Sequence, residues 1–294
     1  MKRYFLDLSG DDLTRYSSLF AGNYNVISFK TSNFPAGEVY FNLDTDTMPD
    51  LTDSTVVIIL NSGKSDDIMR LLMANDAIRR YDVKSVELFM PYVPYGRQDR
   101  VVRAGDSLSV KVFADLINSL HFDKVIITDP HSYVTPAVLN NCVIDTYGLD
   151  AFILITMTYR LLDMTPVTIV APDAGAEKRC SKVANTFNQK LATATKHRTP
   201  EGITIKMNTN DISERVVIID DICDGGRTFI ELAKVLKGEY GVKHVTLIVT
   251  HGIFSAGMRV FDGLIDEIRC YNDISKDTRS LMNVVKNSTK LFGR

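Results

Sequence analysis

Residues 216–236, VVIIDDICDGGRTFIELAKVL, join a run of apolar residues to two adjacent aspartates, a pair of glycines and an amphipathic segment. Glycines can adopt positive φ and let backbone N–H groups face a ligand, and the N–H groups at the start of a helix attract a phosphate. Carboxylates accept hydrogen bonds, as the vicinal hydroxyls of a sugar require. The stretch therefore favours binding of a phosphorylated sugar by Asp220, Asp221, Asp224, Gly225, Gly226 and Thr228. The alternative is an ordinary strand-to-helix loop with an acidic N-cap.

Elements able to position these residues recur along the chain. Short runs rich in Val and Ile occupy residues 55–60, 85–90, 124–129, 167–173, 215–221 and 244–250. Their apolarity is continuous rather than alternating, which is typical of strands covered on both faces, as in parallel sheets. Helical segments are expected between them, at 66–80, 107–120 and 176–188. This alternation predicts an α/β fold with mainly parallel sheets flanked by helices.

The composition is that of a globular protein with one large domain or two ordinary ones. The 294 residues are 45% hydrophobic and 24% charged, and the formal net charge is −2, so we expect no nucleic acid or membrane partner. The uncharged runs are shorter than the roughly 18 residues of a membrane helix, and the N-terminus lacks the apolar core of a signal peptide. Cys142, Cys180, Cys223 and Cys270 form no C-x-x-C pair. We therefore expect reduced thiols and a cytoplasmic protein, rather than disulfides or a zinc site.

The sequence of strand, polar loop and helix occurs twice, which predicts two similar domains, at 1–147 and 148–294. In open α/β sheets, ligands bind beyond the carboxyl ends of the strands. Polar clusters follow four of the predicted strands, with the sequences PYGRQDR, DPHS, PDAGAEKR and DDICDGGRT. These clusters hold the candidate functional residues.

The glycine-containing stretch resembles the phosphoribosyl-diphosphate binding loop of the type I phosphoribosyltransferase fold. Two groups of enzymes share that fold: transferases that consume phosphoribosyl diphosphate and synthetases that make it. Residues 89–117, FMPYVPYGRQDRVVRAGDSLSVKVFADLI, are similar to the ribose-phosphate diphosphokinase family. Further similar motifs, found in one order from about residue 33 to 272, are NFPAGEVYFNL, VIITDPHS, VAPDAGAEKR, TKHRT and THGIFS. The resemblance implies two similar type I phosphoribosyltransferase-like domains, with ATP on the side of the first and ribose 5-phosphate on the side of the second.

The resemblance also implies roles for individual residues. ATP would be bound by Phe34, Glu38, Arg97, Gln98, Asp99 and His131, the first two acting from a neighbouring subunit. Ribose 5-phosphate would be bound by Asp173, Asp220, Asp221, Asp224, Gly225, Gly226 and Thr228. Mg²⁺ would be held at His131, Asp173 and Asp129. The catalytic residues would be Lys196 and Arg198, in a flexible loop, together with His131.

Each of these residues taken singly also has a structural explanation. A lone histidine such as His131 is more often structural than a ligand. Asp173 is able to cap the helix expected to begin near Gly175. Lys196 and Arg198 would ordinarily be solvated charges in a polar loop. Their occurrence together at the strand ends of one α/β pattern favours the functional interpretation.

Three residues depart from the family pattern. Ala36 stands where many relatives carry a polar residue facing adenine. Pro130 precedes His131 and stiffens that turn. Arg227 replaces the usual small residue in the phosphate loop, so its side chain must point away or its charge must contact the phosphate.

The activity implied is transfer of the diphosphoryl group of ATP to the C1 hydroxyl of ribose 5-phosphate, with AMP as the second product. One alternative is a phosphoribosyltransferase that consumes phosphoribosyl diphosphate. Another is a catalytically silent family member that regulates an active partner, against which the presence of Lys196, Arg198, His131 and Asp173 argues. Relatives assemble as dimers and hexamers, so we expect a homo-oligomer. The sequence sets neither its size nor any regulation by ADP or phosphate.

Overall fold

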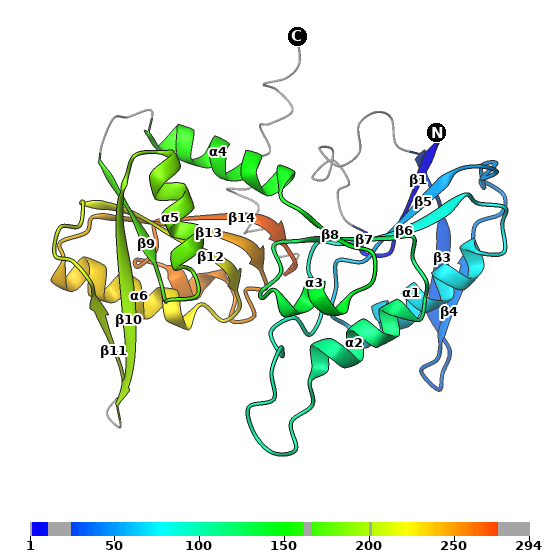
Figure 1. The fold of residues 1–294 in the computed structure, drawn as a ribbon, viewed down its shortest axis with the longest axis horizontal. Helices are drawn as coiled ribbons and strands as arrows, with labels where there is room; N and C mark the ends of the chain where they lie inside the picture. The colour runs from blue at the N-terminus through cyan, green and yellow to red at the C-terminus, as the bar shows by residue number, and fades with distance from the viewer. Residues whose placement is uncertain (1, 11–24, 162–165, 200–201, 276–294) are drawn as a thin grey trace, which may run out of the picture. The chain divides into compact units, whose positions relative to one another are not determined.

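The structure is a computed structural model that describes residues 2–10, 25–161, 166–199 and 202–275 (Figure 1). The chain divides into two compact units, 1–150 and 151–294. The sequence-based boundary, between residues 147 and 148, falls in the first turn of helix α4 (Tyr147–Leu161), which spans the division between the units. Each unit contains one six-stranded sheet.

The sheet of the N-terminal unit is parallel throughout, with strand order β2-β1-β5-β6-β7-β8. Its strands in chain order are β1 (Arg3–Asp7), β2 (Asn25–Val26), β5 (Thr55–Ile59), β6 (Ser85–Met90), β7 (Lys124–Thr128) and β8 (Cys142–Asp145). Its helices are α1 (Ser65–Ile78), α2 (Ser109–Asn118) and α3 (Val134–Val138). Two further strands, β3 (Phe29–Asn33) and β4 (Val39–Leu43), form a separate antiparallel hairpin.

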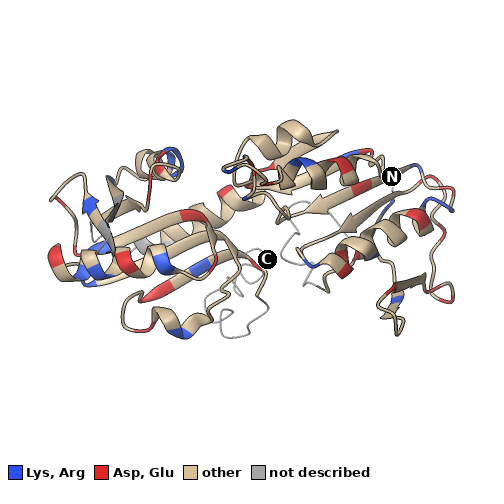
Figure 2. Ribbon diagram, turned by 90° about the horizontal axis from the view of Figure 1, so that it is seen from below, with Lys and Arg blue, Asp and Glu red and all other residues tan. Residues whose placement is uncertain are grey.

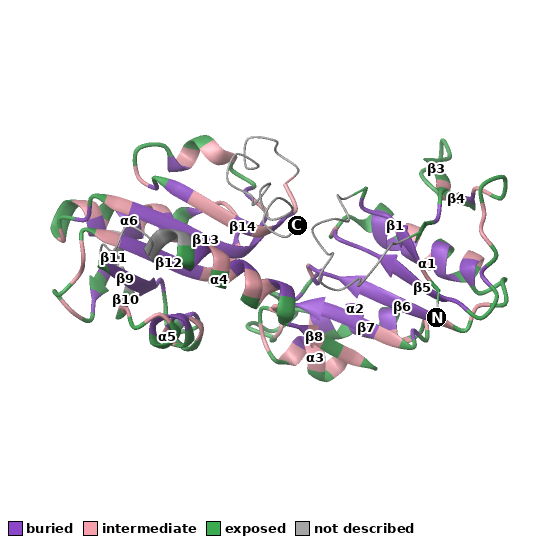
Figure 3. Ribbon diagram, turned by 90° about the horizontal axis from the view of Figure 1, so that it is seen from above, coloured by how far each residue is buried: buried purple, intermediate pink, exposed green. Residues whose placement is uncertain are grey.

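Continuous apolarity in β5 reflects burial on both faces of this sheet, as Figure 3 shows for its strands. Val56 and Ile58 belong to the larger core cluster, which also contains Leu71 of α1 and Phe113 of α2. The alternate residues, such as Val57, belong to a smaller cluster on the other face. Successive side chains of a strand point to opposite faces, so a strand buried on both sides needs an apolar residue at every position.

The sheet of the C-terminal unit has strand order β11-β10-β9-β12-β13-β14 and is parallel except for the β10–β11 pair. Its strands are β9 (Val167–Ala171), β10 (Lys190–Thr199), β11 (Gly202–Met207), β12 (Arg215–Cys223), β13 (His244–Gly252) and β14 (Glu267–Asp273). Its helices are α5 (Glu177–Thr186), α6 (Arg227–Glu239) and the 3₁₀ helix η2 (Met258–Phe261). Leu232 and Leu236 of α6 pack with Val216 and Ile218 of β12 in the core of this unit.

The two units therefore have the α/β architecture that the alternating pattern predicts. In the part of the chain that the structure describes, no helix is long and apolar enough to cross a membrane. Figure 2 shows Lys and Arg residues interspersed with Asp and Glu over the described parts of each unit.

Candidate active site

The loop between β12 and α6 begins with the two adjacent carboxylates. Asp221 is buried and Asp220 is half-buried, and the backbone N–H of Asp221 donates to Oδ1 of Asp220 over 2.9 Å. Burial, and then the neighbouring Asp221 and Asp173 carboxyl groups, raise the pKa of Asp220 to about 8. A carboxyl group with such a pKa is poised to ionise when hydrogen-bond donors or a cation arrive, because either favours its charged form. The pair is therefore suited to receiving sugar hydroxyls or a metal ion.

Gly226 sets the start of helix α6. It is the N-cap residue, has a left-handed φ of 76°, and supplies no side-chain cap hydrogen bond. The alternative of an acidic N-cap is therefore wrong for this loop. A Cβ at Gly226 would lie 2.4 Å from two ring carbons of the buried Phe261, so the position requires glycine for space as well as for φ. The neighbouring Gly225 has an unstrained φ, and a Cβ there would only touch the Ser255 hydroxyl at 3.7 Å.

The rest of the loop is braced by the segment after β13. The Ser255 hydroxyl donates to Oδ1 of Asp224 over 2.6 Å, so one oxygen of Asp224 is occupied by a structural contact. Thr228 is half-buried in the first turn of α6. Arg227, whose bulk was unexplained by the sequence, is exposed at the first helical position and so does not occupy the interior of the loop.

Asp173 follows β9, the strand beside β12 in the sheet, so its loop lies at the same edge as the Asp220 loop. It is exposed, and its Oδ1 accepts the backbone N–H of Ala176 over 3.1 Å at the start of α5. This bond braces the turn before the helix, but the N-cap residue of α5 is Ala176 and no side chain caps the helix, so the explanation of Asp173 as a helix cap is wrong. The second carboxylate oxygen and the proximity to Asp220 keep Asp173 a candidate ligand.

Lys196 and Arg198 lie on an extended strand rather than in an irregular loop. The first residues of β10 pair with β9, and its last residues continue beyond that strand to pair with β11 (Figure 1). In this hairpin the backbone of Lys196 is opposite Ile205 and that of Arg198 is opposite Ile203. Their side chains, and residues 200–201 at the turn, fall outside the described part of the chain. Residues 196–199, KHRT, are polar throughout, so the sequence carries no alternating pattern that would indicate a strand at Lys196 and Arg198.

In the N-terminal unit, Asp129 and His131 follow β7 at the carboxyl edge of the sheet. Asp129 has a left-handed φ of 43°, which is uncommon for a residue with a side chain and is typical of functional sites. His131 is exposed, and Pro130 lies between the two. The turn therefore presents the histidine to solvent rather than packing it into the core.

Asp145 was not predicted as a functional residue, but it ends the neighbouring strand β8 opposite Thr128. Its Oδ1 accepts the N–H of Tyr147 over 3.3 Å, whereas Oδ2 is buried and has no hydrogen-bond partner among the described residues. Burial raises the pKa of Asp145, although the N–H groups of Tyr147 and Gly148 act in the opposite direction. The only signal in the sequence was its place at the end of an apolar run.

The Arg-Gln-Asp motif lies in the long loop between β6 and α2. Arg97 and Gln98 are exposed, and Asp99 is half-buried and forms an ion pair with Arg100 over 3.5 Å. The backbone of Gln98 is fixed at both ends, because its N–H donates to Tyr95 over 2.9 Å and its carbonyl accepts Val110 N–H over 3.3 Å. The loop thus holds the backbone still and leaves two polar side chains directed to solvent.

Phe34 and Glu38 occupy the turn of the β3–β4 hairpin. The N–H of Phe34 donates to the carbonyl of Glu38, and the N–H of Gly37 to the carbonyl of Phe34, each over 2.8 Å. The Phe34 side chain is 54% exposed and meets the ring of Tyr40 edge to face, with centroids 5.9 Å apart. Single exposed aromatic rings are common on protein surfaces, so the role of Phe34 as a nucleotide contact stays a prediction.

Comparison with known proteins assigns the chain to a family. Residues 18–120 match the family model of the N-terminal domain of ribose phosphate pyrophosphokinase, and residues 152–279 match that of the phosphoribosyl transferase domain. The ribose-phosphate pyrophosphokinase of Mycoplasma genitalium is 31% identical over 254 residues, which are 82% of this chain and 74% of that protein. This chain belongs to the ribose-phosphate pyrophosphokinase family. The enzyme of that name from Mycoplasma pneumoniae is 32% identical over 220 residues, or 71% of this chain and 66% of that protein.

A solved structure shows the same fold as this ribose-phosphate pyrophosphokinase family member. The phosphoribosylpyrophosphate synthetase of Mycobacterium smegmatis superposes with a TM-score of 0.74 at 21% identity, covering 92% of this chain and 88% of the other. The predicted family and the predicted α/β architecture with parallel sheets flanked by helices are thus confirmed. The names of the relatives also support the main functional prediction.

Four of the loops that carry predicted site residues lie in two pairs, one pair in each unit of this family member. The loops carrying Asp173 and Asp220 meet at the carboxyl edge of the C-terminal sheet. Those carrying Gln98 and His131 follow β6 and β7, which are neighbours in the N-terminal sheet. Within the described residues, no group of three His, Cys, Asp or Glu side chains is arranged as a metal cluster.

Proposed function

We propose that this chain is a ribose-phosphate diphosphokinase, which transfers the diphosphoryl group of ATP to ribose 5-phosphate. The oxygen on C1 of the sugar forms a bond to the β-phosphorus of ATP, the bond from that phosphorus to the bridging α–β oxygen breaks, and AMP leaves. The hydroxyl proton of C1 passes to solvent or to the departing phosphate. The products are 5-phosphoribosyl 1-diphosphate and AMP.

The observation that carries this proposal is the loop between β12 and α6. It combines two carboxyl groups, one with a raised pKa, with a helix start whose N-cap is a left-handed glycine. Asp220 and Asp221 would accept hydrogen bonds from the ring hydroxyls of ribose 5-phosphate. The backbone N–H groups of Gly225 and Gly226 and the Thr228 hydroxyl would hold its phosphate at the start of α6. Asp224 would stiffen this cradle through its contact with Ser255.

ATP is proposed to bind on the side of the N-terminal unit. Arg97 presents a planar donor group for phosphate oxygens, Gln98 offers both donor and acceptor atoms to the nucleoside, and Asp99 supports the loop through Arg100. Phe34 and Glu38 would approach the adenine from a neighbouring copy of the chain, so the active form would be a homo-oligomer. The aromatic ring of Phe34, at the tip of the hairpin, is 54% exposed and would be accessible to such a neighbour.

Mg²⁺ is the cation proposed for the phosphates, where it would neutralise charge and align the transferring group. Asp129 and His131 would hold it on the ATP side, and Asp173 on the side of ribose 5-phosphate. Oxygen atoms suit this hard cation, and the unpartnered Oδ2 of Asp145 lies at the end of the strand beside Thr128. A buried oxygen without a partner is what a nearby cation or its water would satisfy.

Lys196 and Arg198 are proposed to stabilise charge on the oxygen that leaves with AMP. Their place on the β10–β11 hairpin, beyond the end of β9, puts them on an extension of the sheet rather than in its core. His131, on the ATP side, would be the third catalytic residue. ATP as a substrate and four free cysteines also favour the cytoplasm as the location of this protein.

The test is to incubate the purified protein with ATP, Mg²⁺ and ribose 5-phosphate and to assay AMP. AMP formation that depends on ribose 5-phosphate supports the proposal. Diphosphate release from phosphoribosyl diphosphate that depends on a nucleobase, without AMP, would instead support the transferase. Lys196→Ala is expected to lower kcat by orders of magnitude with ATP binding nearly unchanged, whereas equal loss of both would assign Lys196 to binding.

A further inference from the structure

The β3–β4 hairpin needs support from outside its own two strands. An isolated two-stranded hairpin is at best marginally stable in water. Apolar contacts hold only its base, where Phe29 and Phe41 stack with centroids 5.2 Å apart and pack against the core of the N-terminal unit. Beyond this pair, the hairpin residues from Lys30 to Tyr40 are mostly exposed. The position of the turn must therefore depend on polar contacts.

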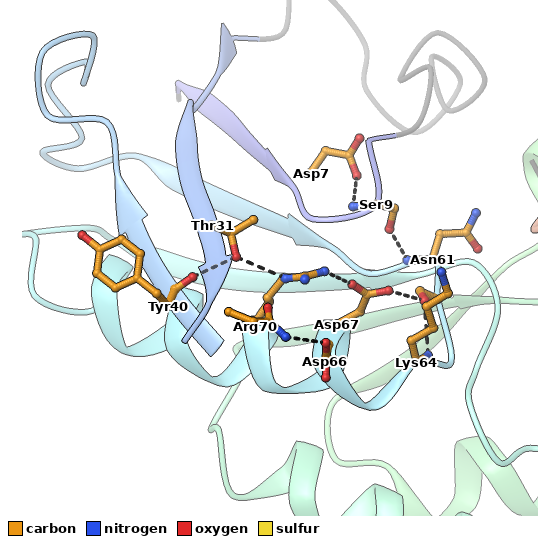
Figure 4. A network of polar contacts seen from close by, with 11 residues as sticks. Asp7, Ser9, Thr31, Tyr40, Asn61, Lys64, Asp66, Asp67 and Arg70 are labelled. Atoms are coloured by element: carbon orange, nitrogen blue, oxygen red, sulfur yellow. Dashed lines mark hydrogen bonds and ion pairs between the residues drawn. The ribbon is translucent and has the colours of Figure 1, made fainter. Parts of the chain in front are cut away.

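Those contacts come from the first two turns of α1, as Figure 4 shows. Nε of Arg70 donates to the Thr31 hydroxyl over 3.2 Å, and that hydroxyl donates to the carbonyl of Tyr40 over 2.8 Å. One oxygen therefore joins both strands of the hairpin to the helix. A second contact lies one residue before the turn, where the Asn33 side-chain amide donates to Asp66 over 2.8 Å.

Arg70 is itself held from the opposite side. Its Nη1 donates to Oδ1 of Asp67, and Oδ2 of Asp67 accepts the Ser62 hydroxyl over 2.5 Å. The side chains of Arg70 and Asp67 are only 23% and 12% exposed, so the pair is shielded from much of the solvent. A guanidinium directs its donors in a fixed plane, which allows one side chain to serve Thr31 and Asp67 together.

The same chain of contacts reaches the carboxyl edge of the sheet. Ser62 lies in the loop after β5, and the N–H of the preceding Asn61 donates to the Ser9 hydroxyl over 2.6 Å in the loop after β1 (Figure 4). A Cβ at Gly63 would be 3.9 Å from the ring of Tyr92, which begins the loop that leads to Arg97 and Gln98. The hairpin is thus connected, through Arg70, to the edge where the nucleotide loop begins.

We propose that Arg70 is a positioning residue for the ATP site, acting by fixing the β3–β4 hairpin on α1 and so setting the place of Phe34 and Glu38. The inference deepens the proposed function and rests on it, because it concerns the residues proposed to contact adenine. Arg70 does not itself touch the substrate. Its role is to keep the turn in one position when a neighbouring subunit presents its nucleotide.

The kinetic test compares Thr31→Val, which removes only the hydroxyl, with the wild type and with Thr47→Val. Thr47 is an exposed threonine that likewise donates to a backbone carbonyl, of Asp44, and among the described residues no hydrogen bond joins its side chain to α1. We expect Thr31→Val to raise KM for ATP about fivefold, as for loss of one hydrogen bond to a charged group at a partly exposed site. KM for ribose 5-phosphate and kcat should stay unchanged. Thr31→Ser, which keeps the hydroxyl, should restore the wild-type KM.

A double-mutant cycle shows whether the effect passes through the turn. In the Phe34→Ala/Glu38→Ala background, Thr31→Val should have little further effect on KM for ATP, because both groups that it displaces are gone. Arg70→Lys should reproduce the effect of Thr31→Val, because it removes the planar guanidinium whose Nε and Nη1 reach Thr31 and Asp67 together. Additive effects in the cycle, or a change in KM for both substrates alike, would overturn the proposed positioning role.

A measurement without substrate separates failure of this inference from failure of the proposed function. The chain contains no tryptophan, so Phe34→Trp places a single reporter at the turn. We expect its fluorescence anisotropy to fall when Thr31→Val or Arg70→Lys is added, but not when Thr47→Val is added. Unchanged anisotropy would overturn the inference whatever the activity. Lowered anisotropy in a protein that makes no AMP would uphold the contact and reject the function.

Discussion

Gly226→Ala is the substitution for which the structure makes the sharpest quantitative prediction. The added Cβ would lie 2.4 Å from Cε1 and Cζ of Phe261. Carbon atoms in contact are normally about 3.5–4.0 Å apart, so the ring would have to move by more than about 1 Å. Phe261 is only 2% exposed and packs edge to face on Phe254 with centroids 6.2 Å apart, so it has little room to move.

Two costs add in this variant. Overpacking a well-packed core costs about 1–3 kcal/mol. A left-handed φ of 76° costs an alanine about 1 kcal/mol relative to glycine. The free energy of unfolding should therefore fall by about 2–4 kcal/mol. Because relief requires the start of α6 to shift, the affinity for ribose 5-phosphate should fall as well.

The assay is urea denaturation of the full chain, comparing midpoints at an unchanged m value. Gly241→Ala is the matched control. Gly241 also has a left-handed φ, of 67°, but nothing lies within 4 Å of the position that its Cβ would take. This control should lose only about 1 kcal/mol and should bind ribose 5-phosphate like the wild type, as measured by calorimetric titration.

Equal destabilisation by the two alanines would refute the steric reasoning, because it would mean that the Phe261 ring moves aside without lowering the free energy of unfolding. A large loss of stability with unchanged affinity for ribose 5-phosphate would refute a different step. It would show that the start of α6 does not hold the phosphate. The two measurements therefore test the packing around the loop and its proposed use separately.

Three further predictions concern pH, thiol reactivity and a partly buried ion pair. Because the pKa of Asp220 is raised to about 8, the folded protein keeps a proton that the unfolded chain releases, so stability should fall from about pH 4 to pH 8. The urea midpoints of Asp220→Asn should vary less over that range. Burial raises the thiol pKa of Cys180 and Cys223 to about 12. Iodoacetamide at pH 8 should therefore label these two thiols only when the protein unfolds. Rapid labelling of the native protein would contradict their burial. Arg3→Met should lower the free energy of unfolding by about 2 kcal/mol, because it leaves the buried Glu87 carboxylate without its two hydrogen bonds from Arg3. The urea midpoint measures this loss. An unchanged midpoint would mean that water replaces the arginine.

Much of the architecture could be predicted because it depends on local patterns of apolar residues in the sequence. The run TVVII of β5 is apolar at every position, and the two faces of that strand enter two different core clusters. The same reasoning located the strand ends, and with them the loops of Asp129, Asp173 and Asp220. Continuous apolarity identifies a strand that is covered on both sides, and the carboxyl end of such a strand is where ligands bind.

Features that depend on partners distant in sequence could not be predicted in this way. Nothing in the residues around Gly226 indicates Phe261, whose ring makes glycine necessary there. The strand character of the segment with Lys196 depends on pairing with β11, so a polar run was expected to be a loop. The unpartnered oxygen of Asp145 likewise appears only when β8 is placed beside β7.

The hairpin that carries Phe34 shows why the two kinds of information must be combined. Its turn residues could be proposed as nucleotide contacts from the sequence, but a short exposed hairpin has no fixed position by itself. In the proposed arrangement its position comes from polar contacts with α1, chiefly those of Arg70, a residue that no motif contains and that lies on a helix otherwise occupied with core packing. A motif therefore identifies the groups that meet a ligand, and long-range contacts determine whether those groups are held where the ligand can use them. In this chain the contacts that would meet the second requirement are those of Arg70 with Thr31 on one side and Asp67 on the other, together with that of Asn33 with Asp66.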